Sequence, residues 1–385
     1  MRIPFLKKGF NTGDEVVAAF SRESELDKKV LYSRAKRMER VRSYLDNASD
    51  EDRNSFLRHF TILQRTFSNY AVIATRLNLY IDNNVLQDIL QLDDPKRKAA
   101  PRVHALLAFL ALAQDYYFVH VTAFLTPTVL YEASHRGAHP TKETVDSIVA
   151  LLANVGLYSR GTFGGDRNVS KLFRLIRHDE KNIAKALSEI KARDWNLTYK
   201  IDPSEDGLGG VRIPFAMADE MCPNVELRYF QPWTLKYVLM HIIHLQMKSR
   251  SADKSAEAMM KSIANDRDLS FLKLTRKDKS EIEGLADIEL FTNCMLRAQE
   301  AHQSTTINMG ISFDEMLMKS LFQQLGIARG VSVDGDRDSD EGRTRVAYLL
   351  WHSQREGDML NKRAQLLEEA LGSFLSEMLH GLTKV

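Results

Sequence analysis

The stretch that decides the fold is LNLYIDNNVLQDIL, residues 77–90, where a short apolar run passes directly into an amphipathic helix. The apolar run predicts a buried strand over 77–82. Apolar residues at helical spacing then predict a helix near 84–91, with Asn83 or Asn84 as its N-cap, although an Asp that ends a strand, as Asp82 does, is often an N-cap itself. A carboxylate at the end of a buried strand is costly unless a partner uses it, which makes Asp82 a candidate functional residue.

A second junction, INMGISFDEMLMKSL at 307–321, has the same form: an apolar strand, then Asp314, then a helix. Strands separated by helices indicate an α/β fold with a parallel sheet. The carboxyl ends of parallel strands meet at one edge of such a sheet, and ligands gather there. We therefore expect Asp82 and Asp314 to lie at the same edge.

Two further acids stand near the starts of predicted helices. Glu132 follows the Thr126–Pro127 helix start in LTPTVLYEAS, and Asp287 lies in GLADIELFTNC. Carboxylates gathered in one site repel one another and raise each other's pKa values. A divalent cation removes that repulsion, and oxygen ligands suit Mg²⁺ or Mn²⁺.

In their order along the chain, the four segments resemble the motifs of the PIN-domain nucleases. LYIDNNVLQDIL is similar to the opening strand and helix of that family, in which an Asp is followed two residues later by a small polar residue, here Asn84. The second motif of the family is a helix with a Glu, the third is an Asp at a helix start, and the fourth is a strand ending in an Asp. The resemblance implies a small parallel sheet flanked by helices and metal-dependent hydrolysis of phosphodiester bonds, usually in RNA, with DNA left open.

The resemblance also implies roles for individual residues. Asp82 and Asp314 would bind Mg²⁺ or Mn²⁺ directly, while Glu132 and Asp287 would bind the cation or orient the attacking water. Asn84 would hydrogen-bond a ligand carboxylate or a substrate phosphate. Substrate contacts are also expected from the basic residues after the first motif, Lys96, Arg97 and Lys98.

The chain is longer than a compact PIN domain requires. We expect a helical N-terminal extension over 1–74 and a PIN-like domain over 75–330 that contains a helical insertion at about 150–275. An acidic loop and a helical tail over 331–385 complete the chain. The added helices are candidates for binding a protein partner or a second copy of the chain. Because the insertion separates the second motif from the third, Asp219 and Glu220 are alternatives to Asp287.

The composition is that of a soluble globular protein: 385 residues, 44% hydrophobic, 27% charged, with a net charge of +2. A charge this small decides nothing about a nucleic-acid partner. The two cysteines, Cys222 and Cys294, show neither metal-type spacing nor a disulfide framework, which favours a reducing, cytoplasmic location. The most apolar stretch, 103–118, contains Gln114 and Asp115, so no membrane span is expected.

Other interpretations remain open. The chain could be a catalytically inactive PIN-like scaffold that binds RNA or protein, and a toxin or defence role is compatible with a nuclease. Two Arg-to-His spacings, Arg53 with His59 and Arg297 with His302, resemble the short motif of metal-independent HEPN ribonucleases. The basic run at 28–42 fits either a phosphate-binding surface or a salt-bridged helix face.

Overall fold

The computed structural model shows an α/β fold in which a small parallel sheet is flanked by helices. The structure describes residues 13–72, 74–92, 99–134, 142–159, 166–192, 218, 220–232, 235, 236, 239, 273, 274, 282–294, 305–314, 317 and 357–379. The α/β class and the parallel sheet predicted from the sequence are confirmed.

The main sheet has four parallel strands in the order β3-β2-β1-β6. Leu77, Leu79 and Ile81 of the central strand β1 alternate with less buried residues, because every second side chain points to the same face. Strand β6 pairs with β1 although more than two hundred residues separate them in the sequence. The strands are β1 (Arg76–Ile81), β2 (His120–Phe124), β3 (Tyr158–Ser159) and β6 (Thr306–Ile311).

The strand order creates a switch in direction beside β1. After β1 the chain proceeds to β2 and then to β3 on one side, and β6 later lies on the opposite side of β1. In open parallel sheets, ligands bind outside the carboxyl ends of the strands at such a switch point. The fold therefore marks the end of β1 and the end of β6 as the place to look for a site.

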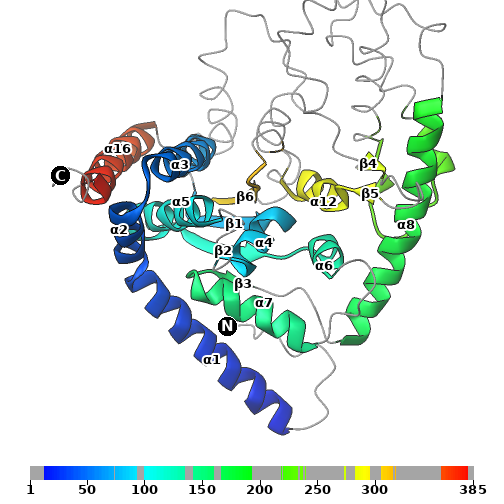
Figure 1. The fold of residues 1–385 in the computed structure, drawn as a ribbon, viewed down its shortest axis with the longest axis horizontal. Coiled ribbons are helices and arrows are strands. Elements are labelled where there is room, and N and C mark those ends of the chain that lie inside the picture. Colours follow the sequence, from blue (N-terminus) through cyan, green and yellow to red (C-terminus); the bar gives the residue numbers. More distant parts are fainter. Residues whose placement is uncertain are drawn as a thin grey trace, which may run out of the picture.

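Helices from both ends of the chain pack on the left of the sheet in Figure 1. Their apolar faces form one core, in which Phe60 of α3 stacks on Phe374 of α16 and Phe67 of α3 meets Phe109 of α5 edge-on. The extension and the tail thus share the core of the sheet domain. The helices of this core are α2 (Arg37–Asn47), α3 (Asp50–Ala71), α5 (Ala100–Ala111) and α16 (Gly357–Leu379), with the π-helical turn η2 (Leu112–Tyr116) after α5. Helix α1 (Gly13–Ala35) precedes them and contacts α2.

Three arginines of the basic run make internal contacts. Arg34 forms an ion pair with Asp115 at 3.1 Å, and Arg40 donates to the carbonyl of Asn154 at 2.7 Å. Arg37 is fully buried and donates to Gln114 Oε1 and to the Gly156 carbonyl, at 2.8 and 3.1 Å. These three residues therefore attach α1 and α2 to the sheet domain, as a salt-bridged helix face would.

The remaining described elements lie mainly on the right of the sheet in Figure 1. Helix α6 packs against α4, α8 and α12, and α12 also packs against β6. No helix among the described residues is both long and apolar enough to cross a membrane. These elements are α4 (Asn83–Leu90), α6 (Pro127–Ala133), α7 (Lys142–Asn154), α8 (Asp166–Ala192), η3 (Cys222–Asn224), α12 (Leu285–Cys294) and the antiparallel pair β4 (Lys273–Leu274) and β5 (Ile282–Glu283).

Candidate acidic site at the sheet edge

Two of the predicted acids follow the paired strands β1 and β6. The Asp82 amide continues the ladder between these strands by donating to the Ile311 carbonyl at 3.0 Å. Asp314 lies three residues beyond the end of β6. The structure therefore places Asp82 and Asp314 beside the switch point, as the two strand-to-helix junctions predicted.

Asp82 is the N-cap of α4, and its Oδ1 accepts a hydrogen bond from the Asn83 amide at 2.6 Å. Of the candidate caps, the structure therefore selects Asp82 rather than either asparagine. The aspartate fills the role because it leaves the strand with extended backbone geometry, which directs its carboxylate to the first helical amides. The side chain has a helix-capping function and is also almost fully buried, with 4% of its surface exposed.

Ser312 connects the two junctions, although no sequence pattern singles it out. Its hydroxyl donates to Asp82 Oδ2 at 2.7 Å and accepts from the Asp314 amide at 3.0 Å. It also accepts from Asn84 Nδ2 at 2.9 Å. A single serine after a strand is too common in sequences to be a signal, so only the pairing of β1 with β6 reveals it.

Asn84 fixes the loop after β6 to the first turn of α4. In addition to its bond to Ser312, its Oδ1 accepts from the Phe313 amide at 3.1 Å. The amide side chain thus bridges the two segments that carry Asp82 and Asp314. Asn84 was expected to hydrogen-bond a ligand carboxylate or a substrate phosphate, and the contacts that the structure shows are with Ser312 and Phe313.

The electrostatics of Asp82 are unusual for an aspartate. The pKa of its carboxyl is raised to about 6, mainly by burial and to a smaller extent by the nearby charge of Asp314. The hydrogen bonds from Ser312 and Asn83 act in the opposite direction but do not offset burial. The anionic form of Asp82 is therefore disfavoured, and a cation beside it would stabilise that form.

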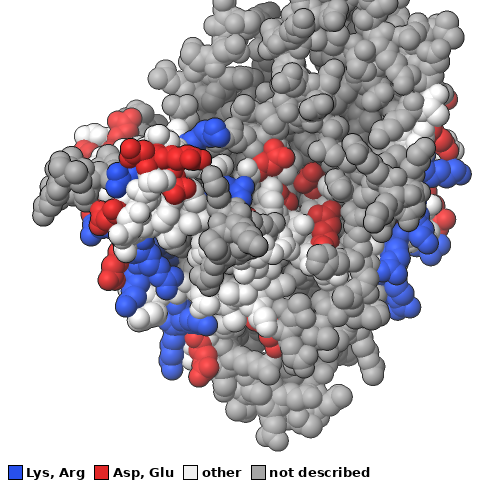
Figure 2. Space-filling model, in the orientation of Figure 1, with Lys and Arg blue, Asp and Glu red and all other residues white. Residues whose placement is uncertain are grey.

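Asp314 differs from Asp82 in its exposure to solvent. It is exposed, and its Oδ1 accepts from the Leu317 amide at 3.2 Å, the geometry of an N-cap. Asp82 is thus buried and Asp314 exposed, and the carboxylate of each accepts a hydrogen bond from a backbone amide that follows it. Figure 2 shows acidic side chains in the middle of the described surface, where Figure 1 places α12 and the end of β6.

The other two predicted acids lie together at the start of α12. Glu132 of α6 accepts from the Ala286 amide at 3.3 Å, and Asp287 follows Ala286 in the first turn of α12. Acids are favourable there because unpaired amides and the helix dipole give a helix start a positive potential. The structure thus brings Glu132 close to the segment that carries Asp287, as the predicted site required.

The four acids form two pairs in this structure, one at the ends of β1 and β6 and one at the start of α12. Among the described residues, no three His, Cys, Asp or Glu side chains are grouped as the ligands of one metal ion would be. Glu220, an alternative ligand, is exposed. Asp219 and the predicted basic contacts Lys96, Arg97 and Lys98 lie outside the described residues.

Helix α6, which carries Glu132, is held by two other carboxylates. Glu289 of α12 accepts from the amide and the hydroxyl of Thr128 in the first turn of α6, and from the Tyr229 hydroxyl. Glu180 of α8 accepts from the Tyr131 hydroxyl at 2.8 Å. Glu132 is therefore carried on a helix that α8 and α12 hold through Tyr131 and Thr128, although these partners come from distant parts of the sequence.

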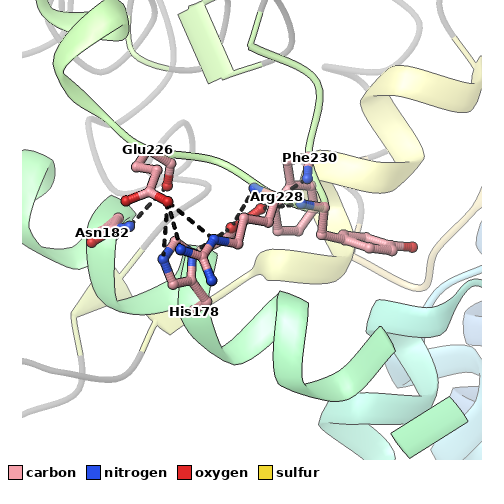
Figure 3. Close-up of polar contacts among 7 residues, drawn as sticks. His178, Asn182, Glu226, Arg228 and Phe230 are labelled. Atoms are coloured by element: carbon pink, nitrogen blue, oxygen red, sulfur yellow. Dashed lines mark hydrogen bonds and ion pairs between the residues drawn. The ribbon is translucent and has the colours of Figure 1, made fainter. Parts of the chain in front are cut away.

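The segment that presents Tyr229 is anchored to α8 by a buried aspartate, Asp179. This carboxylate accepts from three consecutive backbone amides, those of Arg228, Tyr229 and Phe230, at 2.7 to 2.9 Å. Figure 3 shows the surrounding contacts, with His178 and Arg228 both beside Glu226. His178 Nδ1 also lies 3.1 Å from Asp179 Oδ1. Three amides on one carboxylate make a rigid connection, because each is a charge-assisted hydrogen bond.

The HEPN-type spacing does not produce a joint site for Arg53 and His59. Arg53 donates to the Leu45 carbonyl at 2.9 Å, whereas His59 lies edge-on to the ring of Phe313, with centroids 5.9 Å apart. The other pair, Arg297 and His302, lies outside the described residues. Comparisons with protein-family models, with curated proteins and with solved structures found no match to this chain.

Proposed function

We propose that this protein is a metal-dependent nuclease with a PIN-like fold, acting on RNA rather than DNA in the cytoplasm. The observation that supports the proposal best is the position of Asp82, a buried carboxylate with a raised pKa at the switch point of a parallel sheet. Strongly perturbed pKa values cluster at functional sites.

The residues at the sheet edge fit a divalent cation. Each oxygen of Asp82 accepts one described hydrogen bond, from Asn83 or from Ser312, and a carboxylate oxygen has a second lone pair for a cation. Asp314 adds a second, exposed carboxylate near the first. When bound, Mg²⁺ or Mn²⁺ would supply Lewis-acid activation of a phosphodiester and of the attacking water.

The protein's own residues would prepare this site. The hydroxyl of Ser312 holds Asp82 Oδ2 in place, and Asn84 in turn holds Ser312 and the loop of Asp314. Glu132 and Asp287, at the start of α12, are the carboxylates that would complete the ligand set or orient water. This division of roles follows the resemblance to PIN-domain nucleases.

The test is cleavage of end-labelled single-stranded RNA and DNA by the full chain, with Mn²⁺ and with EDTA. Asp82→Asn and Asp314→Asn should each abolish cleavage while remaining folded. The control Glu368→Gln, an exposed acid on α16, should cleave as the unmodified protein does. Cleavage that persists in EDTA would overturn the metal mechanism and direct attention to Arg53 and His59.

A second candidate function is a non-catalytic PIN-like scaffold that binds RNA or protein. The observation in its favour is that Asp82 and Asp314 both bind helix-start amides, a structural role sufficient to explain each. The free energy of unfolding, measured at rising Mn²⁺ concentration, separates the two functions. A carboxylate site gains stability with rising Mn²⁺ by mass action, whereas a scaffold without a site does not.

A further inference from the structure

A fixed arginine stands beside the loop that carries Asp314. Arg102 lies in the first turn of α5, and its Nη2 donates to Asp88 Oδ1 of α4 at 3.1 Å, while its Nε lies 2.8 Å from Oδ2. Helices α4 and α5 pack against each other. The ion pair therefore joins the helix that follows β1 to the helix that precedes β2.

The guanidinium of Arg102 also lies against Phe313, the residue directly before Asp314. Its central carbon is 5.6 Å from the centroid of the ring, a cation–π distance. The ring is held in turn by His59, which contacts it edge-on, and its backbone amide is bound to Asn84. The loop that carries Asp314 therefore also contacts Arg102, through the ring of Phe313.

The ion pair is asymmetric in its exposure. The Asp88 side chain is 4% exposed, whereas that of Arg102 is 30% exposed. The part of the pair that solvent meets therefore belongs to the Arg102 side chain. Its contacts with Asp88 run through Nε and Nη2. A planar group with several N–H donors in a fixed orientation suits a phosphate.

We propose that Arg102 binds a backbone phosphate of a single-stranded nucleic acid, next to the phosphodiester held at Asp82 and Asp314. This inference rests on the proposed nuclease function and adds a substrate-binding subsite to it. Arg102 binds the phosphate and takes no part in the chemical step. Because the contact is with the backbone, it applies equally to RNA and DNA.

Two variants separate this role from a purely structural one. Asp88→Asn removes the ion pair and keeps the arginine, whereas the double variant Asp88→Asn/Arg102→Gln removes the ion pair and the cation together. The double variant also avoids leaving Asp88 as an unpaired buried charge, which would endanger folding. Both variants carry Asp88→Asn, so the difference between them is the effect of the Arg102 charge alone.

The measurement is the affinity of the full chain for fluorescein-labelled oligouridylate and oligothymidylate across a salt series, in EDTA so that no cleavage intervenes. Asp88→Asn should bind at least as tightly as the unmodified chain. The double variant should bind about tenfold more weakly at low salt. Its plot of log K against log salt should be shallower by about 0.7, the value for one phosphate contact on a single strand.

Equal affinity and equal slope in the two variants would overturn the Arg102 subsite, as would failure of the unmodified chain to bind either oligonucleotide. The result is independent of the cleavage assay. Metal-dependent cleavage with an unchanged slope would keep the nuclease and remove the subsite. A changed slope without cleavage would keep the phosphate contact and remove the nuclease.

Discussion

Replacing Asp82 with asparagine tests the central electrostatic argument, because the substitution removes the charge and nearly preserves the shape. The pKa of this carboxyl is 3.8 in its ordinary state and about 6 in the folded protein. Between these values the folded state binds more protons than the unfolded state. The free energy of unfolding therefore falls as the pH rises through this window, and the loss is complete above about pH 6.

The size of the effect follows from the shift. Each pKa unit corresponds to about 1.4 kcal/mol, so ionising Asp82 costs the folded state about 3 kcal/mol. Asparagine also caps helices well, but its amide nitrogen cannot accept from Ser312, which costs about 1 kcal/mol. Asp82→Asn should therefore be less stable than the unmodified chain by about 1 kcal/mol near pH 4, and more stable by about 2 kcal/mol near pH 7.5.

The assay is urea unfolding of both proteins at the two pH values in EDTA, with Glu368→Gln on α16 as a control. That variant removes an exposed charge, so its difference from the unmodified chain should vary little with pH. Adding Mn²⁺ at about a hundredfold excess over its dissociation constant should stabilise the unmodified chain by about 2.7 kcal/mol and leave Asp82→Asn unchanged. An Asp82→Asn difference that is the same at both pH values would refute the reasoning.

Three other substitutions test the contacts that support the site. Ser312→Ala removes a hydroxyl that lowers the pKa of Asp82, so the pH range over which stability falls should extend upward. The variant should also lose about 1–3 kcal/mol of unfolding free energy in urea. Gly156→Ala places a Cβ 2.5 Å from the buried guanidinium of Arg37, at a backbone φ of +78°, and should lower the free energy of unfolding by about 2 kcal/mol or more. The control Gly372→Ala, in an open helical position, should raise the free energy of unfolding by about 0.5–1 kcal/mol. Asp179→Asn should cost about 3 kcal/mol, because three backbone amides lose an anionic acceptor. The exposed control Glu226→Gln should leave thermal stability nearly unchanged, and a large effect there would contradict the assignment of the anchor to Asp179.

The local elements were predictable because their signals are local. Strand β1 and helix α4 lie within one or two residues of their predicted bounds, since alternation and helical spacing report directly on burial. Thr126 caps α6 as expected, with its hydroxyl accepting from the Val129 amide. The N-cap of α4 stayed open in the sequence because Asp82 and both asparagines are good caps, and only the backbone geometry selects one of them.

The parts of the site that depend on pairing could not be derived from one sequence. Ser312 matters because β6 pairs with β1 in one register, which brings it to Asp82, and a shift by one residue would turn it to the other face. Arg102 matters because α5 packs on α4. Neither residue carries a distinctive pattern, and both acquire their roles from neighbours far away in the sequence.

The arrangement of the four acids shows how capping and metal binding can share the same residues. A helix start and a cation both attract a carboxylate, so acids selected for one role also satisfy the sequence pattern of the other. The bond from the Ala286 amide to Glu132 is 3.3 Å long, at the weak end for an N–H···O contact, so moving this carboxylate away from α12 would cost little of that bond. The bonds that hold Asp82 are 2.6 and 2.7 Å, and its burial leaves it no comparable freedom. In a site assembled from these residues, Asp82 is thus the fixed ligand, and Glu132 is the side chain that has to adjust to it.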